Sequence, residues 1–213
     1  MNSRLRPRLG VTLIELMVVV AVLGVLIAVA APSVRKLLDV QRLRGASAAL
    51  TTDIQFVRTE AATRQEVAGI SFRYVAGSQS CYTVHTCGSA TLATCACDCT
   101  AAAGSRCPAV SVGVPDPPRE IKTVSLPTSR GVIVTATNIA GVPVNNARIL
   151  FDPATGGMAS FFPTVLVGVP NPPPGLFVGA TRLISPADGS GAIRTEVSAA
   201  GRPRTCDGLV ACP

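Results

Sequence analysis

The chain has no tryptophan, a single histidine and few charged side chains, and each scarcity excludes a class of function. Aromatic residues make up only 4% of the 213 residues, which argues against a nucleic-acid binder that stacks bases on aromatic rings. Because His85 is the single histidine, most kinds of histidine-based catalysis and most histidine-rich metal sites are excluded. Charged residues are 15% and apolar residues 48%, so the chain is not intrinsically disordered. We find no nucleophile–base pair, paired carboxylates or phosphate loop, and we expect no enzyme, no cofactor and no small-molecule substrate.

Apolar residues are concentrated in one segment near the N-terminus. The segment 1–10 is short and basic. In the next segment, 11–31, Glu15 is the only charged residue. As a helix at about 1.5 Å per residue, this segment spans roughly 31 Å, which is enough to cross a bilayer. The arginines before it would keep the N-terminus in the cytoplasm and place the rest of the chain outside the cytosol.

Two interpretations of this segment compete. The first is a secretory signal peptide that is removed after its small-residue site, Ala28-Val29-Ala30. The second keeps the segment in the mature protein, and Glu15 favours it. A carboxylate within an apolar segment costs on the order of 2.5–3.5 kcal/mol on insertion scales and therefore calls for a partner. An ammonium group of a neighbouring chain would satisfy it and fix the axial register between subunits.

The rest of the chain divides into an amphipathic helix, 32–65, and a β-rich head, 66–213. The helix pattern comes from apolar residues at three-, four- and seven-residue steps: Val40, Leu43, Leu50, Ile54, Val57 and Ala61. Charged residues, among them Asp39, Asp53 and Glu60, are assigned to the opposite face. Pro32 predicts a kink or local melting, because proline lacks the backbone N–H.

After residue 66 the apolar period becomes two, which predicts short strands. We expect them at 70–75, 81–84, 122–126, 132–134, 148–151, 176–178 and 193–197. Asp152-Pro153 followed by Gly156-Gly157 predicts a turn. A proline-rich sequence at 112–118 recurs at 167–173, which we interpret as two loops of similar composition. The expected fold class is α+β, with an antiparallel sheet packed on the long helix.

Eight cysteines indicate an oxidising compartment. They are Cys81, Cys87, Cys95, Cys97, Cys99, Cys107, Cys206 and Cys212. An even number outside the cytosol predicts up to four disulfides, with 105 possible connectivities. The alternative is a metal site in the thiol-dense run 95–99. Thiolate zinc sites use gaps of two to four residues, so we expect disulfides and no metal, with His85 in a structural role within a strand.

The C-terminal run Gly201-Arg202-Pro203-Arg204 carries a candidate anion site. Glycine and proline forbid a helix, so two guanidinium groups project from an extended or turn backbone, and planar arginine forks suit phosphate oxygens. Arg194 is added from charge and nearness in sequence. The alternative is plain solvated surface. The formal charge of the chain falls from +7 to only +4 when residues 1–10, which contain three arginines, are removed.

Residues 10–15, with the sequence Gly-Val-Thr-Leu-Ile-Glu, closely resemble the processing site of type IV pilins and type II secretion pseudopilins. The resemblance implies that a prepilin peptidase cuts between Gly10 and Val11 and methylates the new N-terminus. It implies that Glu15 pairs with the N-terminal amine of a neighbouring pilin or pseudopilin subunit. Val11 departs from the family, in which phenylalanine is usual. Gly24 and Pro32 stand where members place helix-loosening residues.

A narrower resemblance points to the GspH/FimT branch of minor pilins. It is carried by residues 41–44, 53–61 and 151–157. The tail resembles the Gly-Arg-x-Arg signature of FimT-like subunits, which bind double-stranded DNA in natural transformation. This resemblance implies that Arg202 and Arg204 contact DNA.

Three functions remain open at this point. The first is a structural minor pseudopilin that helps to initiate or cap a type II secretion or type IV filament. The second is a DNA receptor on a pilus, and the third is a secreted disulfide-rich adhesin. For the first two we expect a single-pass inner-membrane protein whose periplasmic head becomes extracellular in a filament.

Overall fold

The structure is a computed structural model in which one long helix precedes two antiparallel sheets. It describes residues 12–75, 79–107, 115–127, 132–137, 143–144, 146–162, 179–184 and 192–207. The chain forms two compact units, residues 1–38 and 39–213. The second unit holds the head together with the second half of the helix.

Helix α1 (Leu13–Arg64) is continuous through Gly24 and Pro32, and no break interrupts its backbone. The local melting predicted at Pro32 is therefore not observed, and flexibility at these two positions stays a prediction. Thr12 starts the helix, since its hydroxyl oxygen accepts the Glu15 backbone N–H at 3.3 Å.

The apolar stripe of α1 forms one side of the core. Leu43, Leu50, Ile54, Val57 and Ala61 are all buried, as predicted. Val40 is the exception, with 38% of its surface exposed.

Asp53 corrects the assignment of charged residues to the outer face. It is only 5% exposed and lies on the buried side of α1. Its charge is matched there by groups of the head, described below.

Two five-stranded sheets make up the rest of the head. The first has the order β3-β2-β1-β6-β7, and the second has the order β10-β9-β8-β4-β5, with antiparallel pairing throughout both. The strands of the first sheet are β1 (Ala68–Val75), β2 (Gln79–Thr86), β3 (Arg119–Pro127), β6 (Arg148–Phe151) and β7 (Met158–Phe162). Those of the second are β4 (Ile133–Thr137), β5 (Pro143–Val144), β8 (Gly179–Ile184), β9 (Ala192–Val197) and β10 (Pro203–Asp207).

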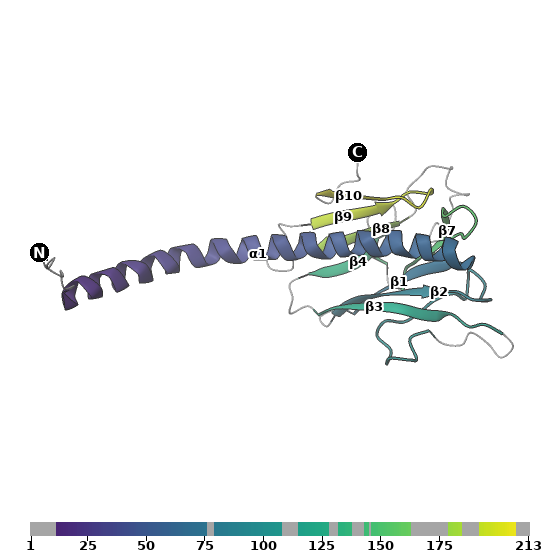
Figure 1. The fold of residues 1–213 in the computed structure, drawn as a ribbon, viewed down its shortest axis with the longest axis horizontal. Helices are drawn as coiled ribbons and strands as arrows, with labels where there is room; N and C mark the ends of the chain where they lie inside the picture. The colour runs from purple at the N-terminus through teal and green to yellow at the C-terminus, as the bar shows by residue number, and fades with distance from the viewer. Residues whose placement is uncertain are drawn as a thin grey trace, which may run out of the picture. The chain divides into compact units, whose positions relative to one another are not determined.

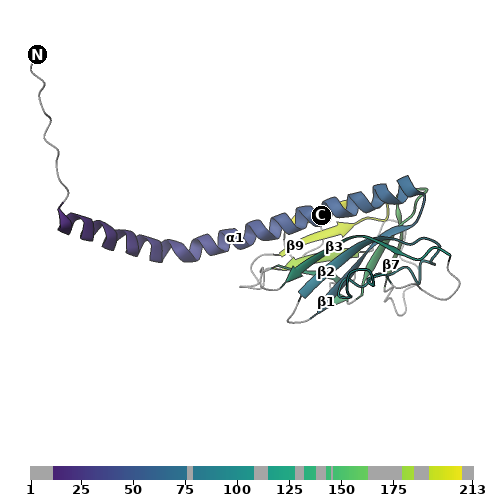
Figure 2. The same cartoon turned by 60° about the horizontal axis from the view of Figure 1, so that its bottom comes forward.

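Both sheets contribute to one core against the second half of α1. Ile70 and Val84 of the first sheet share this cluster with Val134 and Val197 of the second and with the α1 stripe. Figures 1 and 2 show that part of α1 lying along the strands of both sheets. The α+β prediction is confirmed, and burial of apolar surface at about 25 cal/mol per Å² holds helix and sheets together.

Most predicted strands are found. Those at 70–75, 81–84, 122–126, 148–151 and 193–197 lie within β1, β2, β3, β6 and β9, and 132–134 overlaps β4. β5, β7, β8 and β10 were not predicted. The segment 176–178 and the loop at 167–173 lie outside the described residues, as does part of 112–118.

Candidate functional site

The first half of α1 presents apolar side chains that nothing in the described chain covers. From Leu13 to Val29 its large apolar side chains are between 50% and 74% exposed. Gly10 and Val11, the predicted cleavage position, lie outside the described residues. In the part of the chain that the structure describes, no helix satisfies the length and hydropathy requirements for crossing a membrane.

Glu15 is the one charged residue between Leu13 and Val29. Its carboxylate is exposed and has no hydrogen-bond or ion-pair partner among the described residues. Thr12 and Glu15 have the Thr-x-x-Glu spacing of a capping box, and an acid in the first helical turn also offsets the positive end of the helix dipole. This spacing could have identified Thr12 from the sequence, and the prediction missed it. The cap explains where α1 begins and leaves the Glu15 carboxylate available to a partner.

Three disulfides fix the loop between β2 and β3. Cys81 pairs with Cys99, Cys87 with Cys95, and Cys97 with Cys107, with Cα–Cα distances of 5.9, 5.2 and 4.2 Å. Cys206 is also disulfide-bonded, and Cys212 lies outside the described residues. The predicted disulfides are confirmed for the three pairs. They cross-link a segment that has few large apolar side chains with which to build a core.

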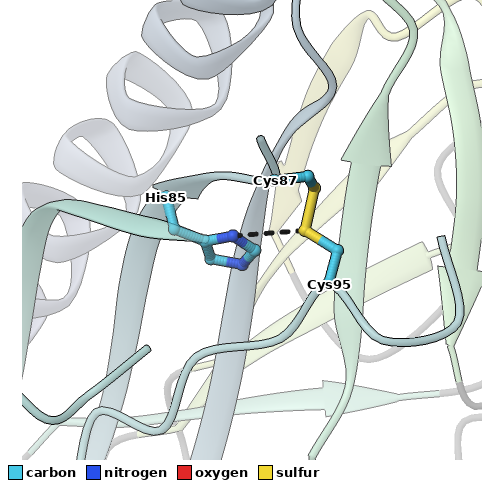
Figure 3. Close-up of side chains that lie close together, drawn as sticks. All are labelled: His85, Cys87 and Cys95. Atoms are coloured by element: carbon cyan, nitrogen blue, oxygen red, sulfur yellow. Dashed lines mark hydrogen bonds between the residues drawn. A yellow bond between two sulfur atoms is a disulfide. The ribbon is translucent and has the colours of Figure 1, made fainter. Parts of the chain in front are cut away.

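His85 lies in β2 beside the Cys87–Cys95 disulfide, and all three residues are fully buried (Figure 3). His85 Nδ1 is 3.6 Å from Cys95 Sγ, and Nε2 is 2.8 Å from Ser71 Oγ. Because a disulfide sulfur carries no proton, Nδ1–H is the donor toward Cys95, and Nε2 then accepts from the Ser71 hydroxyl.

Burial dominates the protonation of this imidazole. It lowers the pKa of His85 from 6.5 to about 4, and the positive charge of Arg148 acts in the same direction, against a backbone hydrogen bond at Thr86. His85, Cys87 and Cys95 offer ligand atoms within 4.8 Å of one another, which is compatible with a metal ion. Zinc binds cysteine in the thiolate form. In the structure the sulfur atoms of Cys87 and Cys95 are bonded to each other in a disulfide, so they are not thiolates.

Asp53 anchors α1 to the first sheet. Its Oδ2 accepts the Tyr82 hydroxyl at 2.8 Å, and Lys122 Nζ donates to Oδ1 and Oδ2 at 2.7 and 2.9 Å. Burial, followed by the hydrogen bond to the Asp53 carboxylate and its charge, raises the pKa of Tyr82. No sequence pattern predicts this group, because its three members come from distant segments.

Arg204 lies in β10, an edge strand of the second sheet, and Arg202 directly precedes this strand. Thr205 Oγ1 is 3.2 Å from Thr51 Oγ1 of α1, so Thr205 faces the helix. Side chains alternate along a strand, and Arg204 therefore points away from α1. The extended or turn backbone predicted for this run is confirmed by β10 and by Gly201, which has a φ of +73°.

The three predicted arginines occupy different environments. Arg202 and Arg204 are exposed, and neither has an acidic partner among the described residues. Arg194 is different, since only 12% of its side chain is exposed and its Nε lies 2.7 Å from Oε1 of the fully buried Glu196. Arg194 is therefore held by a buried carboxylate, unlike Arg202 and Arg204, and its contact with DNA stays a prediction.

The comparisons with known proteins identify the N-terminal segment. The family model described as the prokaryotic N-terminal methylation motif matches residues 5–31. No curated protein and no solved structure matches the chain. The motif implies cleavage by a prepilin peptidase, membrane anchoring and assembly with other pilin subunits, which indicates a structural rather than an enzymatic protein. This motif stands in front of an α+β head that three disulfides cross-link, and the combination supports a type IV pilin-like protein.

Proposed function

We propose that the chain is a minor pilin or pseudopilin of the GspH/FimT kind, which assembles through α1 into a type IV pilus or a type II secretion pseudopilus. In this proposal a prepilin peptidase cuts between Gly10 and Val11. Residues 11–31 anchor the subunit in the inner membrane until it enters the filament. The single observation that carries the proposal is the Glu15 carboxylate, which stands alone in an apolar helix that carries the methylation motif.

The electrostatics of Glu15 support assembly with a second chain. A charge in apolar surroundings is stable only when it is paired. No described side chain is placed to pair with Glu15, whereas cleavage after Gly10 creates an ammonium group at Val11 of every subunit. Pairing of this amine with Glu15 of a neighbour neutralises both groups and sets the axial step between subunits.

The exposed apolar side chains of Leu13 to Val29 support the same proposal. Such a continuous apolar surface is not stable in water, and it requires a covering. Lipid covers it before assembly, and α1 helices of neighbouring subunits cover it in the filament.

The test is to follow processing and incorporation in cells that assemble the filament. We expect mass spectrometry of purified protein to find N-methyl-Val11 as the first residue. Glu15→Val should still be inserted into the membrane and should be absent from purified filaments. Asp39→Val is the matched control, because it removes a carboxylate from the same helix but one that pairs with Arg42 at 3.3 Å.

Two results would contradict the proposal. A mature N-terminus at Ala31 would mean that the apolar segment is a removed signal peptide, as in a secreted adhesin. Incorporation of Glu15→Val at the wild-type level would mean that the carboxylate is not the assembly contact.

A second function, DNA binding by the tail, is favoured by the exposure of Arg202 and Arg204 and by their lack of acidic partners among the described residues. Two phosphate contacts give a slope of log Kobs against log salt of only about −1.8. We expect a salt-sensitive mobility shift of duplex DNA that Arg202→Ala combined with Arg204→Ala abolishes. A shift that persists in the double variant would contradict tail binding, and absence of any shift at low salt would leave a purely structural pseudopilin.

A further inference from the structure

Three segments that are far apart in the sequence meet beside the C-terminal half of α1. Arg58 of α1 donates from Nε to the Gly156 carbonyl oxygen at 2.7 Å. Residues 152–157 form a turn in which the Gly156 N–H donates to the Asp152 carbonyl oxygen at 2.9 Å. The tail joins this turn, since a Cβ on Gly201 would lie 2.5 Å from Gly156 O. Glycine at 201 thus allows the close approach that brings Arg202 to the turn.

A groove of about 660 Å³ lies at this junction. Both Arg58 and Arg202 line it, and its other polar side chains are the neutral Gln55, Thr59 and Thr155. No aspartate or glutamate belongs to the lining among the described residues. The groove therefore combines two fixed positive charges with hydrogen-bonding groups.

The donors of both arginines remain available. Among the described residues, Arg58 makes no hydrogen bond besides the one from Nε and has no acidic partner, so its two Nη groups are free to bind a ligand. Within the described part of the chain, Arg202 hydrogen-bonds through its backbone alone: its N–H donates to Ser198 Oγ at 3.2 Å, and its carbonyl oxygen accepts the Ser198 N–H at 3.0 Å. Holding Nε on Gly156 pre-orients the Arg58 guanidinium and reduces the entropy lost on binding an anion.

The carboxylate of the adjoining turn, Asp152, does not line the groove. Asp152 Oδ1 accepts the N–H groups of Ala154 and Thr155 at 3.0 and 2.9 Å and the Thr155 hydroxyl at 3.0 Å. The Thr155 N–H and hydroxyl hold the pKa of this carboxyl below its usual range. Asp152 is thus directed into its own turn and stabilises the loop that receives Arg58.

We infer that this groove is a seat for a phosphodiester group of DNA, with Arg58 and Arg202 as its two cationic contacts. This inference rests on the proposed DNA binding and adds to it a contact on the helix. It also separates the two tail arginines. Arg202, which directly precedes β10, lines the groove, whereas Arg204 lies within β10 in register with Glu196 and is not part of the lining. Arg58, rather than Arg204, is the partner of Arg202 at the bound phosphate.

The test measures duplex binding by the full-length protein in detergent micelles across a salt series. Arg58→Gln and Arg202→Gln should each weaken binding about fivefold at low salt and reduce the salt slope by about 0.9. Arg44→Gln is the matched control, since Arg44 is exposed on the same helix and does not line the groove. Arg58→Lys should keep the wild-type slope, because it retains the charge.

A second pair of variants leaves the Arg58–Gly156 contact in place. Gln55→Glu puts a carboxylate into the groove and should weaken binding at least as much as Arg58→Gln. Gln41→Glu makes the same change at an exposed position of α1, 14 residues earlier and roughly 21 Å along the helix, and should have little effect. Gln55 is exposed, so neither variant disturbs the core.

The outcomes distinguish this inference from the function on which it rests. Binding that is lost in Arg202→Ala with Arg204→Ala but unchanged in both Arg58→Gln and Gln55→Glu would overturn the groove and keep DNA binding by the tail. No binding by the wild type would overturn both. A parallel titration with inorganic phosphate at the same phosphate concentration identifies the ligand. A response to the free ion without duplex binding would assign the groove to a small anion and overturn the inference.

Discussion

Lowering the pH from 7 to 4.5 should destabilise the head through His85, the only histidine in the chain. Burial between Ser71 and the Cys87–Cys95 disulfide holds the pKa of His85 at about 4, against 6.5 in the unfolded chain. Because the folded pKa is depressed, the unfolded state binds more protons between these two values. The stability that neutral His85 contributes is therefore present above pH 6.5 and is lost as the pH falls toward 4.

The magnitude follows from the two pKa values. A difference of about 2.5 pKa units corresponds to roughly 3 kcal/mol when both forms are fully titrated. At pH 4.5 the folded histidine is still mostly neutral, and the loss of stability relative to pH 7 is about 2 kcal/mol. This is a large part of the 5–15 kcal/mol that is typical of a domain.

The assay is urea unfolding of the protein at several pH values, compared with His85→Gln. Hydrogen bonds and arginine partners also hold the pKa values of Asp98 and Glu120 below the usual range. Protonation of these carboxylates in acid therefore lowers the stability of the folded protein as well. They are present in both proteins, so the difference between the two curves isolates His85. Glutamine is neutral at every pH and can still bond to the Ser71 hydroxyl.

Direct titration provides the check. Histidine labelled with ¹⁵N gives a single imidazole spin system, and we expect its midpoint near pH 4 while the protein remains folded. A midpoint near 6.5, or parallel pH profiles for wild type and His85→Gln, would refute the argument that burial controls this side chain.

Two further predictions concern the packing of the head. Asp53→Ala leaves the buried Tyr82 hydroxyl without its acceptor, which should cost about 2 kcal/mol and lower Tm by about 4–8 °C; Lys122→Ala should cost at least as much, because it leaves the Asp53 carboxylate, whose side chain is only 7% exposed, without its cation. A loss below about 1 kcal/mol in Lys122→Ala would contradict this pairing. Gly201→Ala should lower Tm more than Gly104→Ala, since both glycines have positive φ but only at Gly201 would the new Cβ meet backbone, at 2.5 Å. Equal shifts would mean that the contact with the 152–157 turn is not tight.

The sequence determined those features that local patterns encode. The apolar stripe of α1 and the alternation in β1, β2 and β9 have periods that a short window reveals, because side-chain direction follows backbone geometry. The methylation motif is likewise a local run, and it identified the N-terminal segment directly. β10 escaped prediction because its sequence, which contains Pro203 and Arg204, has no strand pattern, and only its pairing with β9 defines it as a strand.

Only the tertiary structure decided which distant residues meet. The helix pattern assigned the charged Asp53 to the solvent face. Its burial is stable because Lys122, 69 residues away in the sequence, pairs with its carboxylate. The same holds for the choice of cysteine partners among 105 connectivities and for Arg194, which a buried Glu196 holds. The groove at Arg58 exists because two positive-φ glycines let separate turns approach α1. Such contacts depend on long-range packing, which leaves no periodic trace in the sequence.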